Sequence, residues 1–354
     1  MIISQQIEGI TTNTYYNEPK TKISRVNLTA DVDSLVSFSD AERIIDAAYR
    51  GERRLVDFQD ISNSLFCPQY LFTLDNRTQL LLRLAPPSDV RVLQHERDVL
   101  TGDYEILELI RQNAPEVPVP EVVMHCEDGG ELLLGAPFLL TTYIPGVPLD
   151  LIRHELPDEV LTMIDYNLGQ HARRISRIHN SHFGLAGNAS AGRKMYTNWR
   201  SAFLTLFETI MRDAEDLFIS IPYEVLRWHV GRLSYALDDV KVPQLVCYDL
   251  CEAHRAIVDE RTGILNGLLD FERAIWGDPL METSFSEPSL AFLNGYGGNP
   301  LGSPNARARV LLYTLYYNIR AVVEVYYHGL DHEYEIKARR GLVRSLKQLS
   351  EYQV

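Results

Sequence analysis

Two acidic residues in the second half of the chain each follow directly after a short apolar run. Asp249 follows QLVCY and Asp270 follows ILNGLL. Thr262-Gly263 lies between the two runs and has the composition of a turn, so we expect the two strands to pair and to bring both carboxylates to one rim. Phosphoryl transfer uses such a pair, because one carboxylate orients the attacking hydroxyl and the other holds magnesium on the nucleotide phosphates.

Cysteine and histidine residues near Asp249 raise a second possibility. Cys247, Cys251 and His254 have a C-x3-C-x2-H spacing, which is compatible with zinc, but no fourth ligand is apparent. A cysteine nucleophile is not expected either, because Glu252 beside Cys251 raises a thiol pKa. Further on, the WGDP stretch at 276–279 is expected to be a structural turn that anchors the surrounding lobe.

The segments before residue 145 alternate between strand and helix patterns. SDAERIIDAAYRGERR predicts a short helix with Ser39 or Asp40 as its N-cap, and YLFTLDNRTQLLLRLAPP predicts a hairpin that turns at Asp75-Asn76. A helix is then expected over residues 90–112, ending before the prolines of VPVPEV. ELLLG and APFLLTTYI are strand-like, and Pro145-Gly146 interrupts the pattern.

The chain after this breaker predicts a helical lobe. Apolar residues recur at helical spacing over 163–180, 199–217 and 310–327. We therefore predict an α+β fold with a small antiparallel-sheet N-lobe and a larger, mainly helical C-lobe, with a ligand cleft between the lobes. The expected boundaries are 1–53 for an N-terminal extension with a short helix, 54–144 for the N-lobe, and 145–354 for the C-lobe with a hairpin at 245–272.

The chain is acidic, with 34 Lys and Arg against 48 Asp and Glu and a formal charge of −14. A negative surface repels phosphate backbones, so neither nucleic acid nor an anionic membrane is expected as a partner, and a cationic or neutral small-molecule substrate fits better. No signal peptide, membrane-spanning stretch or disulfide pattern among the four cysteines is evident, which favours a cytoplasmic protein. The sequence makes no prediction of oligomeric state or of the identity of the substrate.

Residues 245–280, LVCYDLCEAHRAIVDERTGILNGLLDFERAIWGDPL, resemble the catalytic loop and metal-binding strand of the aminoglycoside phosphotransferase family, whose members are related to choline kinase and protein kinases. The resemblance extends in order over most of the chain, from about residue 54 to its end. It implies a bilobal protein-kinase-like fold, ATP and Mg²⁺ as cofactors, and phosphorylation of a hydroxyl group. Asp249 matches the family's catalytic aspartate, and Asp270 matches its magnesium ligand.

In the N-lobe the resemblance implies a nucleotide site. Arg83, in LLLRLAPP, stands where the family has a lysine that grips the nucleotide phosphates, and Glu96, in LQHERDVL, resembles the helix glutamate that pairs with that cation. The adenine is expected beside segment 139–144, with Thr141 and Tyr143 as candidate contacts.

The sequence also departs from the family pattern. The family histidine falls on Cys247, and the family asparagine, a second metal ligand, falls on His254, although magnesium prefers oxygen ligands. The loop that should cover the phosphates, between Asp57 and Tyr70, contains no glycine, and backbone amides approach phosphate most easily at glycine. The resemblance is therefore to a family member with a degenerate active site.

The sequence is compatible with three functions. The first is ATP-dependent phosphorylation of a hydroxyl on a small metabolite. The second is an ATP-independent enzyme on the same scaffold, in which Asp249 and His254 perform acid–base chemistry such as a cyclisation, isomerisation or elimination. The third is a pseudokinase that binds a ligand or partner without chemistry.

Overall fold

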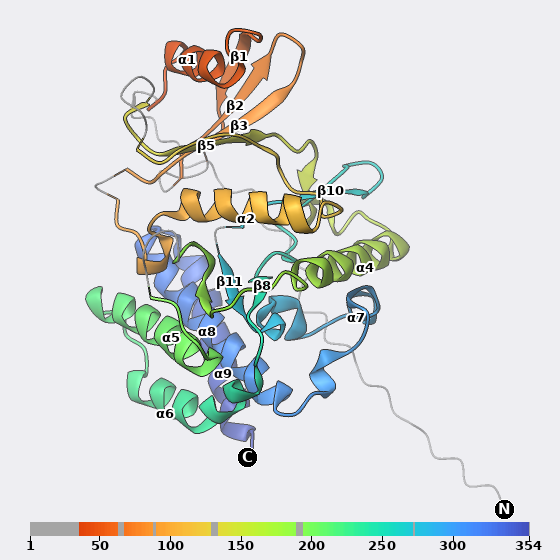
Figure 1. The fold of residues 1–354 in the computed structure, drawn as a ribbon. Coiled ribbons are helices and arrows are strands. Elements are labelled where there is room, and N and C mark those ends of the chain that lie inside the picture. The colour runs from red at the N-terminus through yellow and green to blue at the C-terminus, as the bar shows by residue number, and fades with distance from the viewer. Residues whose placement is uncertain are drawn as a thin grey trace, which may run out of the picture.

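The computed structural model divides into a small lobe built on one sheet and a larger lobe made mainly of helices (Figure 1). This confirms the predicted α+β organisation, with the antiparallel sheet in the N-terminal lobe. The residues that the structure describes are 35–62, 67–87, 90–128, 134–188, 194–271 and 273–353.

The N-lobe is built on a five-stranded antiparallel sheet. Its strands are β1 (Leu55–Asp60), β2 (Gln69–Leu74), β3 (Gln79–Leu84), β4 (Val122–Cys126) and β5 (Phe138–Thr142), in the order β1-β2-β3-β5-β4. The predicted hairpin is confirmed as the β2–β3 pair, whereas the sequence pattern does not predict β4, and ELLLG lies largely outside the described residues. Side chains alternate between the two faces of β3, so Leu82 is buried in the core of the N-lobe while its neighbour Arg83 lies on the opposite face.

Helix α1 (Phe38–Tyr49) covers the outer face of this sheet (Figure 1). The predicted N-cap is wrong, because Ser37 rather than Ser39 or Asp40 caps the helix. The Ser37 hydroxyl accepts from the Asp40 amide at 3.2 Å, and the Asp40 carboxylate accepts from the Ser37 amide at 2.9 Å, which completes a capping box. Ile44 and Ile45 pack into the same core as the sheet. Helix α1, which the sequence analysis assigned to an extension, therefore belongs to the N-lobe.

Helix α2 (Val99–Asn113) lies beneath the other face of the sheet, between the sheet and the C-lobe (Figure 1). The single helix predicted over 90–112 is wrong in its first turns. Residues 94–96 form a separate short 3-10 turn, and Asp98 has a left-handed backbone with φ 60°, which interrupts helical geometry. The apolar stripe of α2, which includes Ile106 and Ile110, is buried in the core of the C-lobe.

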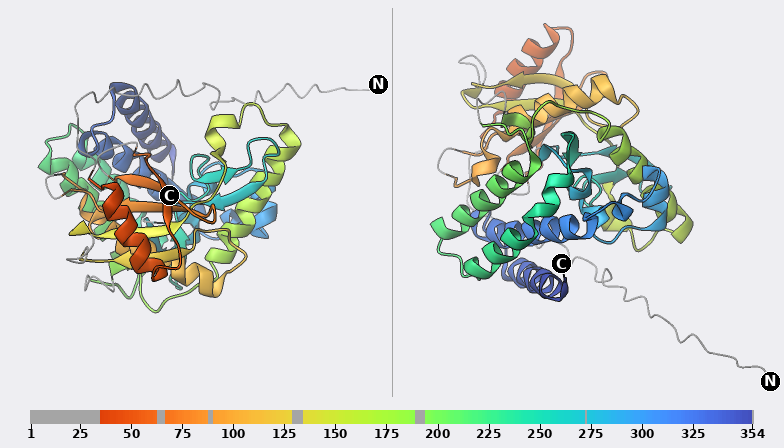
Figure 2. Two further views of the ribbon diagram at one scale, coloured as in Figure 1. Left: turned by 90° about the horizontal axis from the view of Figure 1, so that it is seen from above. Right: turned by 60° about the horizontal axis from the view of Figure 1, so that its bottom comes forward.

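The C-lobe is a helical assembly around α8. Leu315, Ile319 and Val322 of α8 are fully buried, as the apolar spacing over 310–327 predicts. The helices are α3 (Leu149–Ile152), α4 (Asp158–Ile175), α5 (Trp199–Asp216), α6 (Tyr223–Leu233), α7 (Leu290–Tyr296), α8 (Ala306–Tyr327) and α9 (His332–Glu351). Figure 2 shows α1 and α9 at opposite ends of the molecule.

Six short strands form two small sheets in the C-lobe: β6 (Val147–Pro148), β7 (Gly184–Leu185), β8 (Gln244–Cys247), β9 (Ala256–Val258), β10 (Leu265–Leu268) and β11 (Ala274–Gly277). The turn at Thr262-Gly263 joins β9 and β10, which pair as a hairpin. The prediction that the strand before Asp249 pairs with the strand before Asp270 is wrong. Strand β8 pairs with β11, the strand that follows Asp270, because the loop after Asp249 leads the chain away before β9 begins.

The WGDP turn anchors this region to the helices, as predicted. The buried Asp278 carboxylate pairs with Arg309 of α8 at 2.7 Å and accepts a hydrogen bond from the Tyr313 hydroxyl at 2.8 Å. Trp199 of α5 in turn donates its indole N–H to the Tyr313 oxygen at 2.7 Å. This network fixes the position of β11 against α5 and α8, and it touches none of the candidate site residues.

Within the part of the chain that the structure describes, no helix combines the length and the apolar character needed to cross a bilayer.

The packing of α1 on the sheet leads to a stability prediction. Ile44→Ala should lower the free energy of unfolding by about 2–4 kcal/mol, because Ile44 is fully buried and its truncation leaves a cavity. Urea unfolding followed by circular dichroism measures the change. Glu42→Ala, on the exposed side of the same helix, is the matched control and should change the value by less than about 0.5 kcal/mol. Equal effects from both variants would contradict the placement of α1 in the N-lobe core.

Candidate active site

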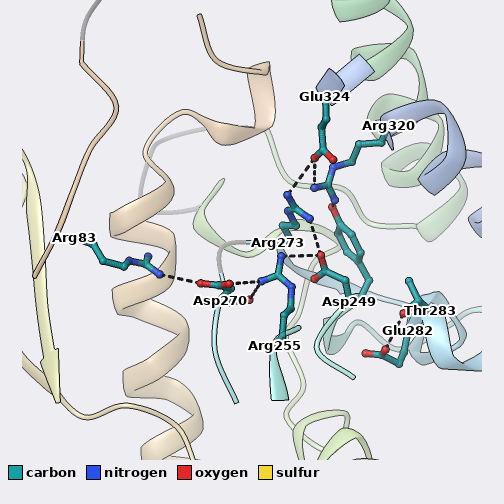
Figure 3. Close-up of polar contacts among 10 residues, drawn as sticks. Arg83, Asp249, Arg255, Asp270, Arg273, Glu282, Thr283, Arg320 and Glu324 are labelled. Carbon is teal, nitrogen blue, oxygen red and sulfur yellow. Dashed lines mark hydrogen bonds and ion pairs between the residues drawn. The ribbon is translucent and has the colours of Figure 1, made fainter. Parts of the chain in front are cut away.

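Both predicted carboxylates lie at the ends of C-lobe strands and meet at one guanidinium group. The Arg255 Nη2 atom lies 2.9 Å from Asp249 Oδ2, and its Nη1 atom lies 3.3 Å from Asp270 Oδ2. Arg255 Nη1 also donates to the backbone oxygen of Asp270 at 2.8 Å. The expectation that Asp249 and Asp270 come together is met, although the strand pairing that achieves it differs from the predicted one (Figure 3).

Arg83 of β3 reaches this pair from the N-lobe. Its Nη1 atom lies 3.3 Å from Asp270 Oδ1, and its Nη2 atom forms an ion pair with the buried Asp103 of α2. The prediction that Glu96 pairs with Arg83 is wrong. Glu96 precedes the break before α2, and its carboxylate accepts from the Leu93 amide at 3.0 Å and contacts His328 Nε2 of α8 at 3.1 Å.

The ion pairs continue from Asp249 into helix α8. Arg273 Nη1 lies 2.7 Å from Asp249 Oδ2, its Nη2 atom lies 3.1 Å from Glu324 Oε1, and Arg320 pairs with the same Glu324 oxygen. Carboxylates and guanidinium groups thus alternate without interruption from the N-lobe to the C-lobe, in part visible in Figure 3. We call this the ion-pair series, and its members in order are Asp103, Arg83, Asp270, Arg255, Asp249, Arg273, Glu324 and Arg320.

The charge state of Asp249 follows from its position in the series. Burial by itself would raise the pKa of Asp249, but the guanidinium groups of Arg255 and Arg273 outweigh burial and hold this pKa well below its ordinary value. Asp249 is therefore a carboxylate throughout the physiological pH range. Such a weak base suits the orientation of a hydroxyl better than the removal of its proton.

The carboxylates of the series differ in how far their side chains are exposed to solvent. The side chain of Asp270 is 37% exposed, against 9% for Asp249 and 2% for Asp103. Asp249 Oδ1 is buried and accepts no hydrogen bond from the residues that the structure describes. Asp270 is therefore the acid of the series that solvent reaches most readily, whereas Asp249 Oδ1 is a buried acceptor.

His254 and the nearby cysteines are the other candidates for chemistry around Asp249. His254 is exposed, whereas its neighbour Arg255 is buried and pairs with Asp249. Burial raises the pKa of both the Cys247 and the Cys251 thiol, which makes neither a nucleophile. Among the described residues, Cys247, Cys251 and His254 do not form a group with metal-binding geometry.

The predicted adenine segment lies at the end of β5. Thr141 is buried and pairs with Leu81 of β3, and the Tyr143 amide donates to the Gln79 carbonyl at 3.0 Å. Their role as nucleotide contacts stays a prediction. The predicted phosphate-covering loop connects β1 to β2, and its residues 63–66 lie outside the described residues.

Five members of the series escaped the sequence analysis: Asp103, Arg255, Arg273, Arg320 and Glu324. Asp103 had a usable signal, because it lies in the apolar stripe of α2, three and four residues before Ile106 and Leu107, where an acid needs a partner. Arg255 and Arg273 follow the two predicted aspartates by six and three residues. Nothing in that spacing indicates that they turn back onto the carboxylates.

Comparison with known proteins now identifies the family. Residues 67–285, more than half of the chain, match the phosphotransferase enzyme family, and the chain belongs to this family. Comparison with curated protein sequences gives no significant match.

Solved structures of this kind share the fold. The aminoglycoside phosphotransferase APH(2'')-Ib with ADP bound is 16% identical with a TM-score of 0.56, and the alignment covers 88% of this chain and 100% of that one. The streptomycin–ATP complex of APH(2'')-IIa is 16% identical with a TM-score of 0.57 over 90% and 99% of the two chains. The macrolide 2'-phosphotransferase of Brachybacterium faecium is 17% identical with a TM-score of 0.54 over 85% and 98%. The predicted kinase-like fold is confirmed.

The side chains around Asp270 do not fit the magnesium site that this family implies. Both carboxylate oxygens of Asp270, the implied magnesium ligand, already pair with guanidinium groups, Oδ1 with Arg83 and Oδ2 with Arg255. His254, at the position of the second metal ligand, is exposed and offers nitrogen where magnesium prefers oxygen.

The far end of the ion-pair series leads to a pH prediction. Burial would raise the pKa of Glu324, but Arg320 and Arg273 lower it to about 2. A carboxylate with a depressed pKa contributes stability that is present above its unfolded-state pKa of about 4.3 and is lost as the pH falls through the folded-state value. Glu324→Gln should therefore destabilise the protein by several kcal/mol at neutral pH, and its difference from wild type should shrink below about pH 4.3.

Urea unfolding at several values between neutral pH and the onset of acid unfolding measures this difference. Glu260→Gln, an exposed position in the β9–β10 turn, is the control and should show little difference from wild type at any pH. A Glu324→Gln difference that grows as the pH falls would contradict the ion pairing.

Proposed function

We propose that this protein transfers a phosphoryl group from a nucleoside triphosphate to a hydroxyl group of a small molecule. Membership of the phosphotransferase family supports the reaction class. The single observation that carries the proposal for this chain is the meeting of Asp249, Asp270 and Arg83 around Arg255, since these groups come from different elements and converge at one place.

Asp249 would position the attacking hydroxyl in this reaction. Its Oδ2 atom is held by Arg255 and Arg273, which leaves the buried Oδ1 atom to accept the hydrogen bond of the substrate. Phosphoryl transfer proceeds through a loose transition state, so orientation of the hydroxyl contributes more than proton removal. The low pKa of Asp249 is compatible with that role.

The guanidinium groups would bind the phosphates. Arg83 and Arg255 both lie beside Asp270, the most exposed carboxylate of the ion-pair series, and arginine binds phosphate oxygens in a bidentate manner. Phosphate binding there would draw Arg83 away from Asp270, to which its 3.3 Å contact is long for an ion pair with charge-assisted hydrogen bonding. The acceptor fits a neutral or cationic molecule, because the chain carries a formal charge of −14.

A second function, ligand binding without catalysis, is favoured by a different observation. Every carboxylate of the ion-pair series is already matched by a guanidinium group, and Asp249 is buried. The acid–base enzyme that would pair Asp249 with His254 gains no such support, because His254 is exposed and Asp249 stays ionised.

The proposal predicts that Asp249→Asn lowers turnover by about a hundredfold or more, because the amide orients the hydroxyl poorly. ADP or GDP release with ATP or GTP, over a panel of neutral and cationic hydroxyl compounds that includes aminoglycosides and macrolides, measures the reaction. Glu260→Gln, an exposed acid in the adjacent hairpin, should retain wild-type turnover.

Unchanged turnover in Asp249→Asn would refute the assigned role of Asp249. Nucleotide binding without transfer to any acceptor in the panel would favour the non-catalytic candidate instead.

A further inference from the structure

Arg255 pairs with Asp270, the acid at the magnesium-ligand position that the resemblance implies, and with Asp249, the acid at the catalytic position. Its two terminal nitrogens contact different acids, Asp249 at 2.9 Å and Asp270 at 3.3 Å, and the side chain is 3% exposed (Figure 3). One guanidinium group therefore bridges both carboxylates from within the protein. The bond from Arg255 Nη1 to the Asp270 carbonyl oxygen, at 2.8 Å, fixes the bridge in place.

The charges of the neighbouring groups show what Arg255 contributes. The ion-pair series holds four carboxylates and four guanidinium groups, so its formal charge is zero. Without Arg255 the same series would carry a net negative charge, and Asp249 and Asp270 would lose the cation that they share. A buried carboxylate that loses its partner is strongly destabilising, and a metal ion can supply the missing positive charge.

A second positive charge at this position would be repelled. A magnesium ion bound to Asp270 would lie beside the guanidinium group of Arg255 and would also face Arg83, which contacts the other oxygen of the same carboxylate. The position of the second metal ligand is held by His254, which is exposed. Both observations disfavour a metal ion in this site.

We propose that the guanidinium group of Arg255 takes the place of the metal cation in this protein, so that the site binds the phosphates of a nucleotide without a divalent ion. Arg255 would hold Asp249 and Asp270 together and, with Arg83, would face the phosphate oxygens. The contacts of Arg255 with both carboxylates are observed in the structure. The nucleotide as the ligand rests on the proposed function.

The first experiment measures Mn²⁺ binding to the protein without nucleotide, by the loss of the free-ion signal in electron paramagnetic resonance. The wild type should show no site at the carboxylate pair. Arg255→Gln, which removes the charge and adds an amide oxygen, should bind Mn²⁺ at least about tenfold more tightly, and Asp270→Asn in that background should abolish the gain. Arg261→Gln, an exposed arginine in the same hairpin, is the matched control and should behave as wild type.

Tight Mn²⁺ binding by wild type that Asp270→Asn removes would overturn the proposal, and so would a correctly folded Arg255→Gln that gains no site. If Arg255→Gln fails to fold, Mn²⁺ binding by wild type and by Asp270→Asn still tests the proposal.

The second experiment measures the dissociation constant of ATP for wild type in EDTA and in excess Mg²⁺ by calorimetry. We expect the two dissociation constants to agree within about threefold. A tenfold difference would correspond to about 1.4 kcal/mol in binding free energy. Binding that requires Mg²⁺ would overturn the role of Arg255 while leaving phosphoryl transfer intact. Absence of ATP and GTP binding under both conditions would instead refute the proposed function, and the Mn²⁺ measurement would still decide the role of Arg255.

Discussion

The alternation of opposite charges along the ion-pair series is the interaction on which this part of the molecule depends. Arg255 and Arg320 are each 3% exposed, and the side chain of Asp103 is 2% exposed. A charge removed from water in this way costs several kcal/mol, and only a partner of opposite sign with good geometry offsets the cost. Strand β3, helix α2, the loops after β8 and β10, and helix α8 must therefore be placed together, because displacement of any one of them leaves a buried charge without its partner.

This requirement explains how the two lobes are joined. The outer face of the N-lobe sheet has its own core with α1, whereas α2 buries its apolar stripe in the core of the C-lobe. The sheet itself separates the two cores, because Leu139 of β5 packs into the core that contains α2. Arg83 adds a polar connection, since it lies on β3 and pairs with Asp103 of α2 and Asp270 of the C-lobe.

The same series connects the family scaffold to the chemistry that we propose. The resemblance to the phosphotransferase family implies a catalytic and a magnesium-binding aspartate, and arginines surround Asp249 and Asp270, the acids at those positions. Arginine donates several hydrogen bonds in fixed directions and stays charged, so it can bridge carboxylates and phosphates at once. A metal ion does the same with oxygen ligands alone. A histidine, His254, at the position where the resemblance implies an asparagine ligand is therefore consistent with the bridge that Arg255 makes.

The sequence by itself determined the division into a strand-rich first lobe and a helical second lobe, the β2–β3 hairpin, and the two aspartates that come together, because apolar periodicity, turn residues and strand ends are local properties of the chain. It did not determine which cation meets which acid. Glu96 looked like the partner of Arg83, but a break at Asp98 removes it from α2 and Asp103 takes its place. Arg83 and Asp270 are 187 residues apart, and Arg273 and Glu324 are 51 apart. Only the packing of distant elements against one another sets these distances, and the strength of an ion pair depends on distance and burial rather than on residue type.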